Sequence, residues 1–231
     1  MTLDILRQRL HNQLLSQTKF TQPSQVVGWL GAVQSQDYAG AKWAVSQRTK
    51  GLTDVEIEQA FADGEILRTH VMRPTWHFVT PLDIRWMLAL TAPRVLMLLA
   101  YLDRQLEVEK SLIHQTNKIL ADALEGGRQL TRAELAAVLQ GNGINTDGLR
   151  LGHLIMHAEL DGIICSGARR GKQFTYALLE ERAPQAKTLE REEALAELTK
   201  RYFRSHGPAT LKDFVWWSGL TMSTCGCFAW R

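Results

Sequence analysis

Cysteine is scarce in this chain. Its 231 residues include only three cysteines, at positions 165, 225 and 227. Such an odd and sparse set excludes a disulfide framework and is typical of a protein in a reducing compartment. The spacing of Cys225 and Cys227 is also too close for half of a typical zinc-binding motif. We therefore expect a cytoplasmic protein without structural disulfides.

Long apolar runs and a targeting segment are also missing. The most apolar window, residues 86–102, is interrupted by Pro93 and Arg94, so it is too short and too broken to span a bilayer. The N-terminus has no basic residues followed by an apolar run, which excludes a secretory signal. We expect no membrane partner.

Neither sign of charge dominates the composition. Lys and Arg number 27, Asp and Glu 24, and the formal net charge is +3. This excess is smaller than that of a dedicated DNA-binding tail, although it permits nucleic-acid contact through local patches. A hydrophobic content of 45% suffices for a core in one large domain or two to three small ones.

The apolar spacing predicts a repeated pattern of helices followed by a β-hairpin. The predicted helices lie at residues 3–15, 23–33, 54–63, 82–92, 94–104, 111–124, 134–139, 148–160, 191–205 and from 211 onward. The predicted hairpins lie at residues 66–79 and 162–178. The chain has no βαβ alternation and no glycine-rich phosphate loop, which argues against a nucleotide-binding α/β fold.

Helix-turn-helix followed by a β-hairpin is the plan of a winged helix. We therefore predict a mainly α protein with small β-hairpins, built from tandem winged helix-turn-helix units. The predicted units are residues 1–80, 81–182 and 188–231. After a turn at residues 216–221 the composition changes abruptly to Cys, Gly and aromatic residues, so we interpret the third unit as truncated.

Two glutamines, Gln34 and Gln36, stand on either side of Ser35 at the end of a predicted helix. A glutamine amide both donates and accepts hydrogen bonds, so it is able to orient a water or to bind a nucleobase. Residues i and i+2 point about 200° apart on a helix, so the pair serves one site only where the helix ends. The run at residues 37–40 allows such an end. The alternative is a solvated helix end with incidental glutamines.

Other polar residues near these elements have two open interpretations each. Asp37 is either a carboxylate that acts as a base or stabilises a cationic sugar, or a residue of the helix end. Arg73 lies in the first hairpin turn, where it suits a phosphate contact, and His77 is either hydrogen-bonded in the structure or faces DNA. His153 and His157 have metal-ligand spacing, but no third ligand accompanies them, so we assign no metal.

Positive charge gathers at the tip of the second hairpin. Arg169, Arg170 and Lys172 have no acidic residue near them in sequence. This suits a wing that grips the DNA backbone or minor groove, and the alternative is a merely solvated turn. Secondary candidates for phosphate contacts are Lys42, Arg132 and Arg150.

Several segments together resemble one family, the tandem winged-helix DNA-binding proteins that include the AlkZ-like DNA glycosylases. The segments that carry the resemblance are residues 34–37, 42–43, 68–70, 73–79, 90–94, 167–171, 207–211 and 216–220. The resemblance extends over residues 1 to about 222. It implies a monofunctional glycosylase that works on double-stranded DNA as a monomer, with no metal or other cofactor.

The resemblance also implies roles for individual residues. Gln34 and Gln36 would hold the water that attacks the sugar as an N-alkylated base leaves, and crosslinks would be further substrates. Ser35 departs from the family pattern, which has a larger apolar or aromatic residue between the glutamines. One alternative is a non-catalytic DNA-binding protein or regulator. Another is an inactive chain whose broken third unit exposes apolar residues, namely Leu211, Phe214, Val215 and Trp216.

Overall fold

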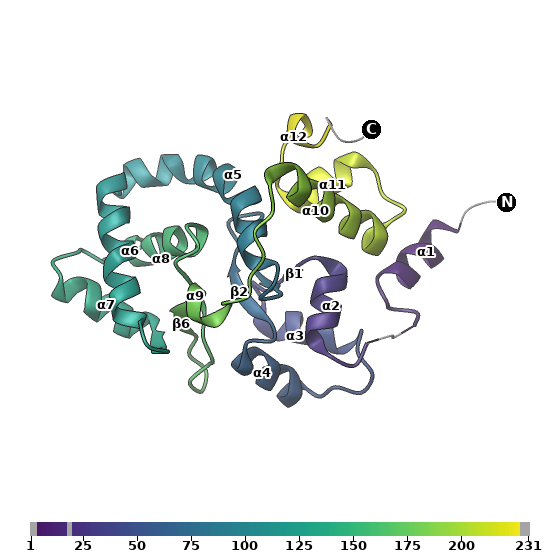
Figure 1. Cartoon of the computed structure of the whole chain (residues 1–231), viewed down its shortest axis with the longest axis horizontal. Helices are drawn as coiled ribbons and strands as arrows, with labels where there is room; N and C mark the ends of the chain where they lie inside the picture. Colours follow the sequence, from purple (N-terminus) through teal and green to yellow (C-terminus); the bar gives the residue numbers. More distant parts are fainter. Residues whose placement is uncertain (1–3, 18–19, 227–231) are drawn as a thin grey trace.

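The computed structural model describes residues 4–17 and 20–226. Helices dominate these residues, and the strands form two small antiparallel sheets of three strands each. The elements form three groups, and a long helix, α5 (Ile84–Gln105), runs beside all of them (Figure 1). This confirms the predicted mainly helical fold with small β-hairpins.

The first group places a sheet against three helices. Its elements, which follow α1 (Ile5–Asn12), are α2 (Pro23–Leu30), β1 (Val33–Gln34), α3 (Tyr38–Ser46), α4 (Asp54–Asp63), β2 (Leu67–His70) and β3 (Trp76–Val79). The strand order is β1-β3-β2. Val27, Phe61 and Phe78 belong to one buried apolar cluster that holds these helices on the sheet.

The second group repeats the same order of elements. They are α6 (Lys110–Leu124), β4 (Leu130–Thr131), α7 (Arg132–Gly141), α8 (Arg150–Leu160), β5 (Ile164–Ser166) and β6 (Thr175–Leu178). The strand order β4-β6-β5 matches that of the first sheet, with each strand in the equivalent place. Leu120, Leu135 and Leu154 are fully buried in a separate core.

The third group is helical and packs on the first half of α5. Its elements, which follow α9 (Leu179–Arg182), are α10 (Arg191–His206), α11 (Leu211–Ser218) and α12 (Met222–Gly226). Phe214 is fully buried in a cluster with Trp86 and Leu195. The expected exposure of apolar residues here is therefore wrong for Phe214 and correct for Trp216, which is 74% exposed.

Several local predictions need correction. Residues 38–46 form a helix that the apolar spacing did not reveal, and the segment after Gly31 is a strand rather than the end of a helix. Of the two outcomes expected at Pro93, a stop or a kink, α5 shows no stop, because it continues through Pro93 and bends along its length (Figure 1). The predicted turn at residues 216–221 is shorter, because α11 continues to Ser218, and a short helix, α12, follows it. Residues 1–3 and 227–231 of the predicted end units lie outside the described residues.

By length and composition, α5 is also long and apolar enough to cross a membrane. However, nine of its residues are buried in the protein, including Trp86 and Met87. A core helix passes the same test of length and composition.

Buried polar contacts join the groups. The backbone N–H of Arg68 in β2 donates to Ser166 Oγ in β5 at 2.8 Å. His70 in β2 forms a buried hydrogen bond with Glu159 in α8 through its Nδ1. These two contacts fix the edge of the first sheet against the second group. The third group is attached by Arg201, whose guanidinium is 2.5 Å from the Asp83 carboxylate.

Candidate active site

The two glutamines lie on extended backbone beside β3. Gln34 is paired with His77 in the sheet, and the Ser35 N–H donates to the Trp76 carbonyl at 2.8 Å. Side chains alternate along an extended strand, and accordingly Gln34 and Gln36 are exposed whereas Ser35 is fully buried. On a helix the two glutamine side chains would point in different directions. On this extended backbone Gln34 and Gln36 face the same side.

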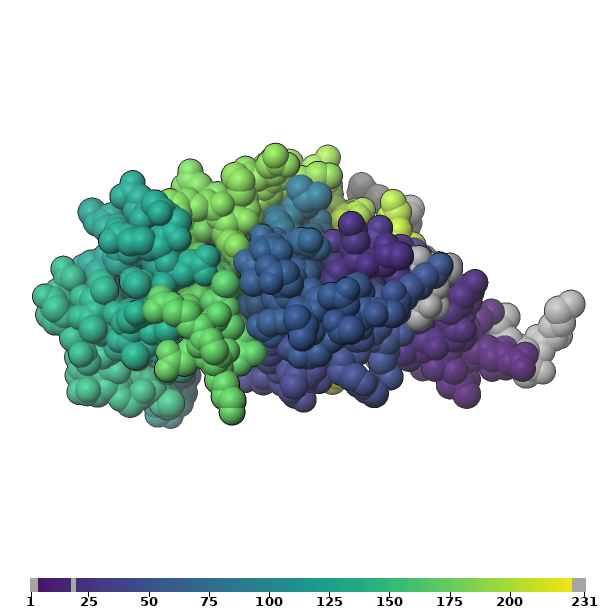
Figure 2. Space-filling model, turned by 90° about the horizontal axis from the view of Figure 1, so that it is seen from below, coloured from purple at the N-terminus to yellow at the C-terminus, as the bar shows by residue number. Residues whose placement is uncertain are grey.

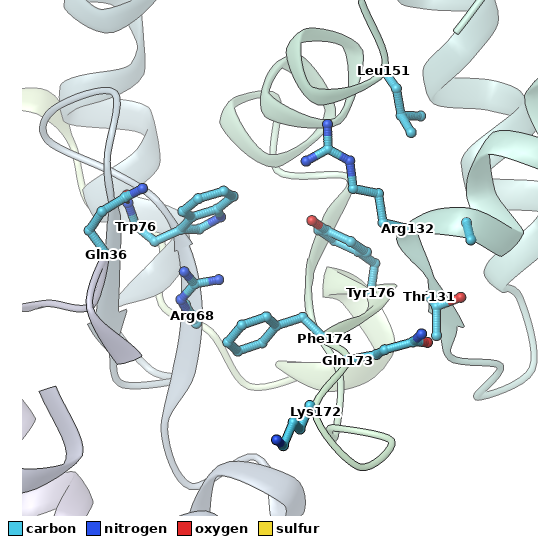
Figure 3. Close-up of a pocket in the computed structure, with 11 residues that line it drawn as sticks. Gln36, Arg68, Trp76, Thr131, Arg132, Leu151, Lys172, Gln173, Phe174 and Tyr176 are labelled. Atoms are coloured by element: carbon cyan, nitrogen blue, oxygen red, sulfur yellow. The ribbon is translucent and has the colours of Figure 1, made fainter. Parts of the chain in front are cut away.

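Gln36 is held at the rim of a cavity of about 620 Å³ between the first two groups (Figure 3). Its Oε1 accepts a hydrogen bond from the Trp76 N–H at 3.4 Å. Gln34 is not among the residues that line this cavity. The lining residues are Gln36, Arg68, Trp76, Thr131, Arg132, Ala133, Leu151, Lys172, Gln173, Phe174 and Tyr176.

Three of the lining side chains are cationic and none is a carboxylate. Arg68 comes from β2 of the first group, Arg132 from the start of α7, and Lys172 from the loop between β5 and β6. Within the described residues, none of these cations forms an ion pair with an acidic side chain. The cavity is therefore electropositive, as a site for DNA requires.

Arg68 is the site residue to which the sequence assigned no role. It is only 6% exposed, and its Nε donates to the Ser35 carbonyl at 3.2 Å. Its guanidinium lies 4.2 Å from the Trp76 ring centre and 4.4 Å from that of Phe174. Burial lowers the pKa of Arg68 to about 10, which still leaves it charged at neutral pH. The available signals were its place in the first predicted hairpin and in the segment 68–70 that carries part of the family resemblance.

Asp37 is an N-cap rather than a residue of a helix end. It immediately precedes α3, and its Oδ1 accepts a hydrogen bond from the Gly40 N–H at 3.1 Å. This carboxylate is exposed and next to Gln36 in sequence. The cap explains why a helix begins here, directly after the glutamines.

The basic loop between β5 and β6 projects at the border of the first two groups (Figure 2). We expected no acidic residue near this loop. This is wrong, because the fold brings two glutamates from other elements next to it. Arg169 lies 3.5 Å from Glu58, and Arg170 lies 2.8 Å from Glu134. Lys172 alone of the three predicted loop cations has no ion pair among the described residues.

Several other predicted DNA contacts are engaged inside the protein. Lys42 is buried and bonds to Asp54 at 2.9 Å and Glu58 at 2.7 Å. Arg150 donates to backbone carbonyls at the end of α5. Arg73 lies 5.0 Å from the Trp216 ring centre, so it faces the third group rather than the cavity.

His153 and His157 do have a third partner, which the sequence could not reveal. Asp103 of α5 presents Oδ1 to both Nε2 atoms, at 2.5 Å from His153 and 2.8 Å from His157. This is the group of potential metal ligands that converges in the described part of the chain. Its distances are those of hydrogen bonds, so we read it as a polar link between α5 and α8.

His77 is buried and its Nδ1 lies 3.0 Å from the Thr75 carbonyl, which supports its structural interpretation. Burial lowers the pKa of His77 to about 4, against about 6.5 in an unfolded chain. Between these values the unfolded chain binds a proton that the folded chain does not. The free energy of unfolding should therefore fall as the pH falls through this window.

Urea denaturation across this window tests the prediction. We expect the His77→Gln variant to lose less stability on acidification than the wild type, because the titrating group is gone. The His114→Gln variant removes an exposed histidine and should keep the wild-type dependence. Equal pH dependence in all three proteins would contradict the assignment.

Burial of the Ser35 hydroxyl lowers the stability of the fold, and a variant can remove this hydroxyl. Its Oγ is buried and has no hydrogen-bond partner among the residues that the structure describes. We expect Ser35→Ala to raise the free energy of unfolding by about 1 kcal/mol, because an unsatisfied hydroxyl no longer has to be buried. Ser166→Ala is the matched control, since its hydroxyl accepts from Arg68 and its loss should be destabilising. A similar loss of stability in both variants would contradict the prediction.

Known proteins resemble this chain over most of its length. The curated "Interstrand DNA cross-link repair glycosylase" of Streptomyces sahachiroi is 27% identical over 223 residues, which are 94% of this chain and 60% of that protein. The solved structure of Streptomyces sahachiroi DNA glycosylase AlkZ matches with a TM-score of 0.78 and 26% identity, over 95% of this chain and 62% of that one.

The chain thus spans about three fifths of the length of these relatives. The family model for DNA glycosylase AlkZ-like proteins matches residues 27–225, which is most of the chain and includes Gln34, Gln36 and the whole lining of the cavity. The chain therefore belongs to the AlkZ-like DNA glycosylase family.

Proposed function

We propose that this protein hydrolyses the N-glycosidic bond of alkylated bases in double-stranded DNA. The observation that carries the proposal is the position of Gln36, which is exposed at the rim of an electropositive cavity. Family membership adds to it independently. Unhooking of crosslinks is included because the Streptomyces relative is an interstrand DNA cross-link repair glycosylase.

The proposed reaction needs little acid–base chemistry. An alkylated purine is already cationic, so it leaves readily as the bond to the sugar lengthens. Gln36, with Gln34 on the same face of the strand, holds a water against the sugar carbon through its amide. Positioning of this kind accounts for a large part of many enzymatic rate enhancements. Asp37 is the adjacent carboxylate, and we assign it electrostatic stabilisation of the cationic sugar.

We propose that DNA is held by tandem winged helices. Support comes from the shared order of elements and strands in the first two groups, which is that of a helix-turn-helix with a hairpin wing. The units would be residues 1–80, 81–182 and 188–231. Arg132 and Lys172 are the predicted DNA contacts that line the cavity, and neither forms an ion pair among the described residues.

We further propose that the protein acts as a cytoplasmic monomer. Cys165 and Cys225 are buried free thiols, which is compatible with a reducing compartment.

The decisive experiment is base release from a duplex that carries a single N7-methylguanine. We expect abasic sites to form under single-turnover conditions without added metal. The same duplex without the lesion is the control. Salt-dependent binding without any base release would instead indicate a DNA-binding protein or regulator, and would overturn the proposed activity.

A further inference from the structure

We propose that Arg68, Arg132 and Lys172 form a phosphate-binding subsite inside the cavity. The ligand is one phosphodiester group of the DNA strand that carries the target nucleotide. This choice of ligand rests on the proposed function, whereas the anion site itself rests on the geometry below.

The most buried cation of the subsite is the guanidinium of Arg68. Aromatic rings lie 4.2 and 4.4 Å from it, and its Nε is used by the Ser35 carbonyl. No acidic side chain among the described residues forms an ion pair with it. Glu159 attracts this charge without touching it, and a buried charge without a direct counterion is costly, so a bound anion would relieve the cost.

Arg132 and Lys172 come from the opposite group and add to the charge, Lys172 at the edge of the cavity, where its amine lies beyond Phe174 and points away from both guanidiniums (Figure 3). In Figure 3 the head group of Arg132 points across the cavity toward Trp76 and Arg68. The Tyr176 hydroxyl points the same way. Burial raises the pKa of Tyr176, so its hydroxyl keeps its proton and can donate to an anion. The cavity therefore offers charge-assisted donors from two sides.

The neighbouring cations are excluded because they are already paired. Arg169 is paired with Glu58, and Arg170 with Glu134. Each would give up an internal ion pair to bind DNA, whereas the three cavity cations would not. Arg169 and Arg170 of the basic loop are therefore not part of the subsite.

The same charges decide which part of the nucleotide enters. A cationic alkylated base would meet three like charges in the cavity, whereas a phosphodiester meets opposite charge. The subsite therefore takes the backbone and leaves the alkylated base on the outer side of Gln36. Gln36 would then face the sugar, which lies between the bound phosphodiester and the alkylated base.

A scan with neutral linkages tests the subsite. The probes are duplexes with one N7-methylguanine in which a single phosphodiester is replaced by a methylphosphonate, at a different position in each. We expect one or two linkages beside the lesion to weaken binding about tenfold, as loss of a charge-assisted contact implies. In Arg132→Gln and Lys172→Gln proteins the same replacements should cost much less.

The salt dependence of binding gives a second readout. Each of these variants should lower the slope of log K against log salt by about 1, because each releases one fewer counterion. Lys187→Gln and Arg191→Gln remove exposed cations far from the cavity and should leave the coupling to the neutral linkage unchanged. Both test variants alter exposed or partly exposed side chains, so they are expected to fold.

The outcomes separate this inference from the proposed activity. Base release with no linkage sensitivity, or with equal sensitivity in the variants, would overturn the subsite alone. Linkage sensitivity that the variants abolish, without base release, would overturn the activity and keep the subsite. Saturable calorimetric binding of inorganic phosphate that Arg132→Gln removes, without linkage sensitivity, would assign the site to free phosphate and overturn the DNA assignment.

Discussion

Replacing Gln36 with alanine lowers the rate of base excision by about 10²–10³-fold, the range seen when one positioned polar group of an active site is removed. The physical reason is that Gln36 presents its amide at the rim of the cavity, and no residue that lines the cavity is a carboxylate that could take over its role. DNA affinity should change little, because the amide carries no charge. Single-turnover excision and equilibrium binding separate the two effects.

Gln34 provides the test of whether the pair acts as one unit. If both amides hold the same water, the double alanine variant should lose no more than about the larger single loss, since groups that act together are not additive. Gln185→Ala is the matched control, because this glutamine is exposed in the connection before α10. Unchanged excision in Gln36→Ala would contradict the assignment.

Replacing Glu159 with alanine destabilises the folded protein by about 1–3 kcal/mol, because the buried His70 ring loses its hydrogen-bond partner. Glu159 is 1% exposed and its partner His70 is 3% exposed, so water cannot replace the missing carboxylate. The centres of the His70 and Trp76 rings are 4.3 Å apart. Trp76 lines the cavity, so a shift of His70 would also disturb the cavity wall. Urea denaturation measures the change.

The control for this prediction is Glu180→Ala, which removes an exposed glutamate from α9. It should leave the denaturation midpoint near the wild-type value. The double variant with His70→Ala should recover part of the loss, because the uncompensated partner is removed as well. A Glu159→Ala protein as stable as the control would show that the pair does not hold the two groups together.

Regular elements were predictable from the sequence where one local signal dominated. The capping boxes at Thr53 and Thr131 begin helices as predicted, because the cap and its Glu are three residues apart. The helix at residues 38–46 was missed because its apolar pattern is weak and its start depends on the Asp37 cap. The strand at Val33 is two residues long, and only its pairing with β3 defines it.

The site was predictable in part. Gln36, Arg132 and Lys172 were identified from sequence and do line one cavity. Arg68 was not, because its significance comes from Trp76 and Phe174, which only the fold brings together. The ion pairs of the basic loop were equally invisible, since both carboxylates come from distant helices.

The hydrogen bond from the Arg68 N–H to Ser166 Oγ has a consequence for how the protein can be divided. It ties an edge strand of one sheet to the other, so the two halves of the cavity keep a fixed separation. A fragment that contains the first group alone would retain both glutamines yet lack the opposite wall. The proposed activity therefore depends on the interface between the two repeats, and we expect neither repeat alone to retain a fraction of it.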